Sequence, residues 1–389
     1  MHILGDISVS QFLSEYWQKK PLLIRNAFKA FESPLEPDDL AGLALEEMIE
    51  SRIILEQGET PWQLLNGPFT EQVFRDLPEE KWTLLVQGVD QWVPEVAELL
   101  QYFKFIPKWR LDDVMVSFAP KGGSVGPHFD QYDVFLLQAH GKRTWQLGPK
   151  YDTTAERVSN TPLNILKHMD VTDEWTLEPG DMLYIPPQYA HNGVAINDCM
   201  TFSFGFRAPS HAEIIGGVSQ HIMTDLNEEQ RYSDAERSES TSPALIEDRA
   251  FSQIEHIVRQ NLNNPLALRE WFTEYMTQPK YPELCEPLEE PLEWDELAPL
   301  LTPSTVLMQN ETSRWAYFEH EGNVHFYCNG QPIIQSNDTK LIELCRGIWD
   351  NTSTSVMEIS ANLDQNTVQQ LLLTLINNNT LYIEAHDTV

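Results

Sequence analysis

The 389-residue chain has few cysteines and no long apolar run. Its four cysteines, at positions 199, 285, 328 and 345, form no C-x-x-C pair, so we expect neither a disulfide framework nor a zinc cluster. No apolar stretch approaches the length of a membrane span. The first residues carry neither the basic nor the apolar region of a signal peptide. Together these absences predict a protein of the reducing cytoplasm that does not enter a membrane.

Basic residues are also scarce, with 26 Lys and Arg against 59 Asp and Glu, for a formal net charge of -33. Such a field repels phosphate backbones and attracts basic partners. The charge therefore speaks against nucleic-acid binding and favours a basic protein partner, although acidity that only aids solubility explains it equally well. A hydrophobic fraction of 41% suffices for packed cores, and the length suggests two or three domains.

The segment 126–130 (GPHFD) holds two residues of metal-binding type. His128 and Asp130 are two positions apart, and residues at this spacing in a strand point to the same face. The glycines before the pair and the apolar run 134–137 after it favour a strand. We therefore predict that an imidazole and a carboxylate project together from one strand. Alone, an H-x-D triplet is a weak signal.

A second histidine, His191, strengthens the prediction of a metal site at His128 and Asp130. His191 follows a turn at 179–181 (PGD), a short apolar strand at 182–185 and a Pro-Pro break, an order that returns the chain to an adjacent strand. Two histidines and one carboxylate with open positions form the ligand set of non-haem Fe(II) enzymes that activate dioxygen. By itself His191 is compatible with an ordinary half-buried histidine. Beside the first motif, we predict that His128, Asp130 and His191 are catalytic metal ligands.

Between the two motifs lies a strand with a basic residue, in the segment 141–149 (GKRTWQLGP). Alternation places Arg143, Trp145 and Leu147 on one face. If that face lines a cavity, Arg143 is a buried cation that needs an anionic partner. A dicarboxylate cosubstrate supplies one through two parallel hydrogen bonds. The alternative is a rim arginine paired with a protein carboxylate.

These motifs resemble the JmjC branch of the 2-oxoglutarate oxygenases. The segments 12–25 (FLSEYWQKKPLLIR) and 112–118 (DDVMVSF), with arginine at position 143, are similar to the bacterial ribosomal oxygenases of that branch. The similarity is specific over the first 207 residues and looser beyond them. It implies an α+β fold built on a double-stranded β-helix (a cupin or JmjC jelly roll). It also implies Fe(II) on the triad, 2-oxoglutarate held by Arg143, and a hydroxyl from Ser117 for the cosubstrate.

The resemblance further implies hydroxylation of an arginine of the sixteenth large-subunit ribosomal protein, a basic partner. Such a substrate needs a counter-carboxylate near the iron, for which Asp112, Asp113 and Asp133 are equal candidates. Ser203, on the small polar face of the strand 201–207, is a weaker cosubstrate-binding candidate. The alternatives are a JmjC-type demethylase, a cupin metalloenzyme acting on a small acid, and a metal-binding interaction protein. The last is disfavoured because a scaffold has no need of an open coordination face.

The domain organisation is predicted in four parts. They are a catalytic domain at 1–208, a helical block at 209–280, an acidic proline-rich linker at 281–303 and a winged-helix-like domain at 304–389. Helices are expected at 211–224, 247–262 and 265–276. The resemblance implies a homodimer through the helical block, and a helical cap folded on its own barrel is the alternative. The candidate recognition helix, 367–376, carries no Lys or Arg, which favours protein contact over DNA.

Three expectations concern the surroundings of the site. Residues 7–19 are expected to form an amphipathic helix on which Phe12, Leu13, Tyr16 and Trp17 share a face. Residues 150–176 form a long excursion between the motifs, expected to cover the site or to meet the substrate. His140 and His168 have no partner at ligand spacing and are expected not to bind the metal.

Overall fold

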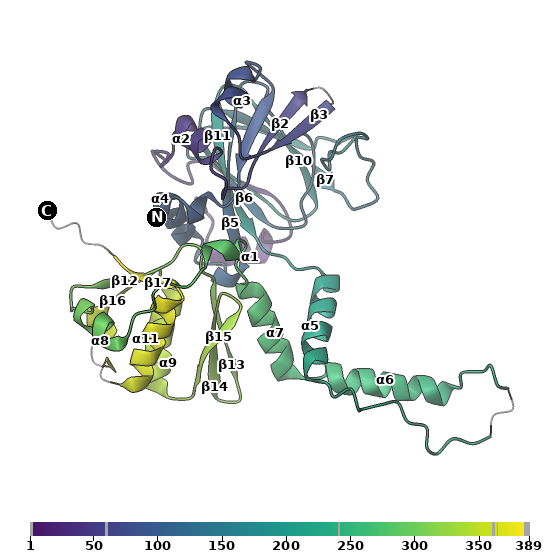
Figure 1. Cartoon of the computed structure of the whole chain (residues 1–389). Helices are drawn as coiled ribbons and strands as arrows, with labels where there is room; N and C mark the ends of the chain where they lie inside the picture. The colour runs from purple at the N-terminus through teal and green to yellow at the C-terminus, as the bar shows by residue number, and fades with distance from the viewer. Residues whose placement is uncertain (1–2, 59–60, 240–241, 360–361, 364, 385–389) are drawn as a thin grey trace. The chain divides into compact units, whose positions relative to one another are not determined.

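The computed structural model describes residues 3–58, 61–239, 242–359, 362–363 and 365–384. The chain divides into two compact units, Met1–Ala208 and Pro209–Val389, each of which is described by itself (Figure 1). None of the helices in these described ranges combines the length and apolar character needed to cross a bilayer.

The first unit is a sandwich of two antiparallel sheets. The large sheet has the strand order β1-β9-β6-β11-β5-β4-β2-β3 and the small sheet has the order β10-β7-β8. The strands are β1 Leu22–Ile24, β2 Ser51–Gln57, β3 Pro61–Asn66, β4 Trp82–Val86, β5 Leu111–Ala119, β6 Val134–His140, β7 Arg143–Lys150, β8 Asp173–Leu177, β9 Met182–Ile185, β10 Tyr189–Ala195 and β11 Cys199–Phe206.

Strand β6 shows why an unbroken apolar run forms a strand here. Successive side chains of a strand point to opposite faces. Val134 and Leu136 face the small sheet and pack with Trp145 and Leu147, whereas Phe135 joins the core on the opposite face. Both faces of β6 are therefore buried, and the metal motif 126–130 directly precedes this anchored strand.

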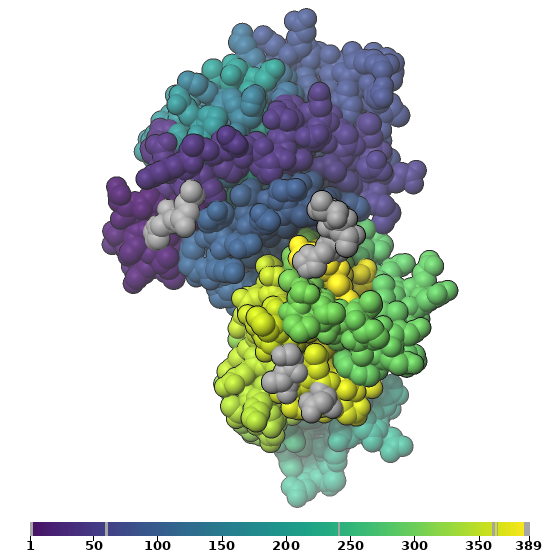
Figure 2. Space-filling view, turned by 90° about the vertical axis from the view of Figure 1, so that its left-hand side faces the viewer, coloured from purple at the N-terminus to yellow at the C-terminus, as the bar shows by residue number. Residues whose placement is uncertain are grey.

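Short helices and 3-10 turns cover the outer face of the large sheet. They are α1 Val9–Glu15, α2 Pro37–Leu43, α3 Glu71–Asp76, α4 Pro94–Leu99, η1 Val89–Gln91, η2 Leu100–Phe103 and η3 Lys108–Arg110. In Figure 2 the purple and blue segments, which precede the metal motifs in the chain, form most of the visible surface of this unit. The N-terminal third of the chain thus builds one wall of the sandwich.

Helix α1 is shorter than predicted and buries fewer residues. The Ser8 hydroxyl caps it by accepting from the backbone N–H of Gln11. Phe12 has no exposed surface and contacts the rings of Phe135 and Tyr184. Leu13 is 37% exposed, so the prediction that it shares the buried face is wrong. The helix contributes little more than one anchoring ring to the core.

The second unit contains three long helices followed by a mixed region. The helices are α5 His211–Asp225, α6 Asp248–Leu262, α7 Pro265–Thr277, α8 Trp294–Leu297, α9 Thr339–Asp350, α10 Val356–Ile359 and α11 Asn366–Asn377, with the 3-10 turns η4 Pro282–Leu284 and η5 Ala298–Leu300. The strands β16 Ser353–Ser355, β12 Val306–Gln309 and β17 Leu381–Ile383 form one sheet, and β13 Trp315–His320, β14 Asn323–Cys328 and β15 Gln331–Ser336 form another. The first three helices lie close to their predicted ranges.

The segment 281–303, expected to be a linker, packs on the core of the second unit. Leu297 has no exposed surface and belongs to the same apolar cluster as Leu307, Trp349 and Leu372. The backbone N–H of Leu288 donates to the carbonyl of Asn377. The apolar residues of this segment therefore pack on the core, although its many acidic and proline residues suggested an extended linker.

The contrast between Phe12 and Leu13 gives a stability test. Phe12→Ala removes a fully buried ring and leaves a cavity, so we expect the free energy of unfolding to fall by about 3–5 kcal/mol. Leu13→Ala, on the exposed side of the same helix, should change it by about 0.5 kcal/mol or less. Denaturant unfolding of the two variants measures both values. Equal losses would contradict the assignment of α1 as a one-residue anchor.

Candidate metal centre

The two metal motifs are joined by their backbones. The N–H of His128 donates to the carbonyl of His191 (3.0 Å), and the N–H of His191 donates to the carbonyl of His128 (2.8 Å). This pair is an isolated bridge outside the regular ladders. His191 is a residue of β10, as predicted, but the prediction that His128 and Asp130 share one strand is wrong.

The local sequence explains the irregular backbone. Gly126 has a φ of +83°, in the left-handed region that favours glycine. Pro127 follows it and has no N–H to donate. A regular ladder therefore cannot run through the segment, and His128 alone pairs with the neighbouring strand. The carbonyl of Asp130 accepts from the N–H of Gln188 (2.7 Å), which fixes the end of the segment.

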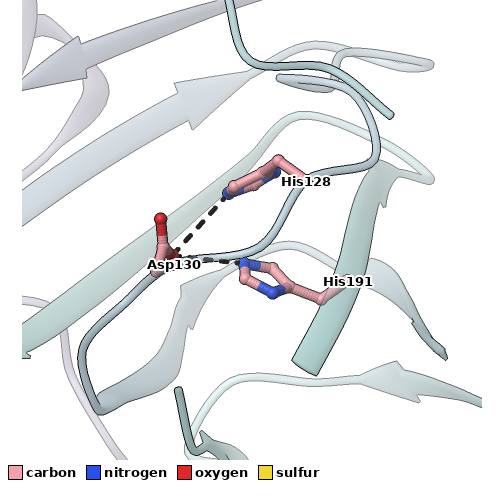
Figure 3. A group of neighbouring side chains, drawn as sticks. All are labelled: His128, Asp130 and His191. Atoms are coloured by element: carbon pink, nitrogen blue, oxygen red, sulfur yellow. Dashed lines mark ion pairs between the residues drawn. The ribbon is translucent and has the colours of Figure 1, made fainter. Parts of the chain in front are cut away.

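The three predicted ligands converge on one point. Asp130 Oδ2 lies 3.9 Å from Nε2 of His128 and 3.7 Å from Nε2 of His191 (Figure 3). One ligand atom of each residue lies within 4.8 Å of the others, and no other His, Cys, Asp or Glu joins the group in the described ranges. His140 and His168 lie outside it, as expected. Two imidazoles and one carboxylate at this spacing fit a single divalent transition metal such as Fe(II).

Hydrogen bonds orient both imidazoles for this role. Nδ1 of His128 contacts the carbonyl of Gly126 (2.9 Å), and Nδ1 of His191 contacts the carbonyl of Tyr189 (3.0 Å). A carbonyl can only accept, so each Nδ1 carries the proton and each Nε2 keeps its lone pair for a metal. Burial, helped by the neighbouring His128, lowers the pKa of His191 to about 4 against the opposing effect of Asp130. His191 is therefore neutral near pH 7, as a metal ligand must be.

Arg143 is a buried cation without an anion. It is 3% exposed, and none of the acidic residues that the structure describes forms an ion pair with it. Its NH1 donates to the hydroxyls of Ser117 (3.2 Å) and Thr201 (3.3 Å), while its Nε has no partner. Burial lowers the pKa of Arg143, since the charged form is desolvated. The alternative of a rim arginine is wrong, and an anion is needed to complete the site.

The polar residues around Arg143 were only partly foreseen. Ser117, on β5, lies beside the guanidinium as the resemblance implied. Ser203 is buried but forms no hydrogen bond with Arg143 in the described structure. Thr201, two residues earlier on the same face of β11, takes that position and was missed. Gln138 was missed too; its Oε1 accepts from the Thr201 hydroxyl (3.3 Å), which turns a Thr201 lone pair toward Arg143.

Asp133 has a structural role. It has no exposed surface and accepts from Tyr184 (2.6 Å), Gln18 (2.9 Å) and Arg110 (3.3 Å). Burial raises its pKa in spite of these donors. Its oxygens are already engaged inside the protein. Asp113 is also buried, and it accepts from the side-chain amide of Gln87 (2.8 Å), whereas Asp112 is partly exposed.

The excursion between β7 and β8 packs on the metal-bearing segment. The N–H of Leu166 donates to the carbonyl of Pro127 (2.7 Å), and Ile165 fills the space where a side chain at position 126 would lie. The guanidinium of Arg157 lies 5.9 Å from the ring of Phe129. The excursion thus supports the backbone that carries His128 and Asp130, rather than merely covering it.

Two family models match the chain, and known proteins resemble it along most of its length. Residues 98–214 match the JmjC domain, and residues 258–382 match the ROXA-like winged helix. The chain is 36% identical over 298 residues to the ribosomal protein uL16 3-hydroxylase of Escherichia coli K12, covering 77% of this chain and 79% of that one. The chain belongs to the bacterial JmjC ribosomal oxygenases.

Solved structures of YcfD, a ribosomal oxygenase from Escherichia coli, share the whole architecture. Its X-ray structure has a TM-score of 0.88 at 31% identity and covers 99% of this chain and 100% of its own. Its complex with cobalt and 2-oxoglutarate has a TM-score of 0.85 at 31% identity, covering 98% and 99%. The predicted fold class of this ribosomal oxygenase, a cupin-like JmjC sandwich followed by a winged helix, is confirmed.

The geometry of the triad predicts how this oxygenase binds a metal. Titration with Co(II) under anaerobic conditions should give one ion per chain. Asp130→Ala removes one of three ligands and should weaken binding at least about 100-fold, since even outer contacts of a metal site are worth 10- to 100-fold. His168→Ala, an exposed histidine outside the group, is the matched control and should bind like the wild type. Wild-type binding by the Asp130 variant would refute the assignment.

Proposed function

We propose that this oxygenase uses Fe(II) and 2-oxoglutarate to hydroxylate an arginine of ribosomal protein uL16. One observation carries the proposal: beside the triad, the buried guanidinium of Arg143 has no acidic partner. A protein that buries such a charge needs a ligand carboxylate to offset the desolvation. The similarity of the chain to the uL16 hydroxylase and to the complex of YcfD with cobalt and 2-oxoglutarate supports the same proposal.

The residues divide the work in a simple way. His128, Asp130 and His191 would hold the iron on one face and leave the opposite face open. Iron with bound 2-oxoglutarate would supply dioxygen activation, in which one oxygen atom enters a C–H bond of the substrate and the other enters succinate as 2-oxoglutarate loses carbon dioxide. Arg143 would bind the far carboxylate of 2-oxoglutarate, with Ser117 fixing its guanidinium and Ser203 in a weaker supporting position. The protein thereby orients the reactants and keeps the site dry.

An arginine substrate fits the charges near the triad. The negative charge of Asp130, with smaller effects of Asp113 and Asp112, raises the pKa of the hydroxyl of Tyr132, a side chain that is 43% exposed. These groups therefore lie close together, and a guanidinium can pair with carboxylates and stack on an aromatic ring. A net charge of -33 also attracts a basic ribosomal protein. We favour Asp112 as the counter-carboxylate, because it is partly exposed whereas Asp113 and Asp133 are buried.

The proposal predicts a defined product. With Fe(II), 2-oxoglutarate and dioxygen, mass spectrometry of uL16 should show the gain of one oxygen on one arginine. Asp130→Ala should give no product. Arg143→Ala should keep the metal but raise the KM for 2-oxoglutarate about 30-fold, because hydrogen bonds to a charged group are lost. Succinate without modified uL16 would overturn the ribosomal substrate, and formaldehyde from a methylated peptide would favour the demethylase.

We also propose that the chain works as a homodimer through α6. This 15-residue helix has no buried residue. Its apolar residues are 40–59% exposed and consist of Phe251, Ile254, Ile257, Val258 and Leu262. Figure 1 shows α6 standing apart from α9 and α11 of its own unit. An apolar stripe this long on one helix is typical of a protein interface, and a second copy offers a matching stripe through two-fold symmetry.

The dimer can be broken at this stripe. The double variant Phe251→Glu, Ile254→Glu places two charges on the apolar face, so light scattering should give the mass of one 44.8 kDa chain instead of two. Glu255→Gln, on the same helix and paired with Arg259, is the control and should stay dimeric. A wild-type monomer would contradict the proposal.

The winged helix is proposed to contact protein, without direct nucleic-acid binding. Helix α11 carries no Lys or Arg, and most of its apolar residues, including Leu372 and Leu375, are buried. Phosphate contacts need cations. We therefore keep the prediction of a basic protein partner and of a site of action in the cytoplasm.

A further inference from the structure

Trp145 is a buried residue that the proposed chemistry leaves without a role. It lies on β7, two residues after Arg143 and on the same face, and is 5% exposed. The guanidinium carbon of Arg143 lies 5.3 Å from the centre of its ring. The ring of His191 comes from the paired strand β10, and its centre lies 6.0 Å from the centre of the Trp145 ring. A single indole therefore adjoins both the cosubstrate anchor and a metal ligand.

Gly193 makes room for this indole. Gly193 pairs with Trp145 across β10 and β7. A Cβ at position 193 would lie 2.8 Å from Cη2 and Cζ3 of the Trp145 ring, closer than carbon atoms approach in proteins. The φ of Gly193 is not in the left-handed region, so the glycine is required for space and not for backbone conformation. The ring therefore packs directly on the strand that carries His191.

The contacts give the indole an electrostatic and a steric effect. A buried guanidinium without an anion is unfavourable, and the negative face of an aromatic ring offsets part of that cost. The ring also restricts the directions that Arg143 can take. On its other edge, packing against Gly193 limits movement of β10 relative to β7. The indole N–H is buried and forms no hydrogen bond in the described structure, so the ring is held by packing.

We propose that Trp145 is a positioning residue that sets Arg143 and His191 at a fixed spacing, and that Gly193 is the space it requires. The proposal rests on the assigned functions of those two residues. It implies that the cosubstrate site and the metal site respond together when the ring is changed. A residue that served only the fold would alter stability without altering both sites.

The test uses the full-length protein with Co(II) in place of iron, so that no turnover occurs. Calorimetry gives the Kd for 2-oxoglutarate, and the visible spectrum of Co(II) reports its coordination. In Trp145→Leu the Kd should rise about tenfold, the loss expected for one desolvated cation–π contact, and the Co(II) bands should shift. Trp145→Phe keeps a ring and should restore most of both properties. Gly193→Ala displaces the ring and should act like Trp145→Leu.

Trp175 provides a matched control. It pairs with Trp145 across β8 and β7 and packs in the same apolar cluster, yet it has no ring contact with His191 or Arg143 in the described structure. Trp175→Leu should leave the Kd and the Co(II) spectrum unchanged. Wild-type values in both Trp145→Leu and Gly193→Ala, or equal losses in the Trp175 variant, would overturn the proposal.

Failure of the proposed function is recognisable separately. If the wild type binds Co(II) but no 2-oxoglutarate, the oxygenase assignment is wrong, whatever the variants do. In that case the Co(II) spectrum alone tests whether Trp145 positions His191. A shift in Trp145→Leu that is absent from Trp175→Leu supports the contact with His191, and an unshifted spectrum rejects it.

Discussion

Two backbone hydrogen bonds between His128 and His191 are the constraint on which the site depends. They join a segment that precedes the large-sheet strand β6 to the small-sheet strand β10. The backbone alone thereby fixes residues 63 positions apart in the chain as neighbours. The side chains need only adopt the rotamers that their Nδ1–carbonyl contacts favour. Preorganised ligands of this kind reduce the entropy lost on binding an ion.

A second constraint is electrostatic. The protein places Arg143 where it is desolvated and gives it neutral hydroxyls in place of an acid. A permanent ion pair would stabilise the empty protein but would compete with a ligand carboxylate. The unpaired guanidinium therefore trades stability for binding, a common pattern at functional sites. The buried carboxylate of Asp133 follows the opposite rule, with every donor supplied by the protein itself.

The alternation of residues along a single strand correctly predicted which side chains share a face. Arg143, Trp145 and Leu147 share a buried face, as their spacing indicates. Alternation does not predict which residue of that face lies opposite a given residue of the neighbouring strand. Alternation places both Thr201 and Ser203 on one face of β11, but the register opposite Ser117 selects Thr201. The role of Asp133 depends on Gln18, 115 positions away, and no local pattern contains that contact.

The position of Arg143 also links ligand binding to the cohesion of the two sheets. Arg143 belongs to the small sheet, whereas its partners Ser117 and Thr201 belong to the large one. An anion held at this seam is shared by both layers. Occupancy and folding are then coupled by mass action, and the sandwich gains RT ln(1 + [L]/Kd) from its ligand. With the proposed binding at Arg143, free cosubstrate raises the fraction of chains that are folded at equilibrium.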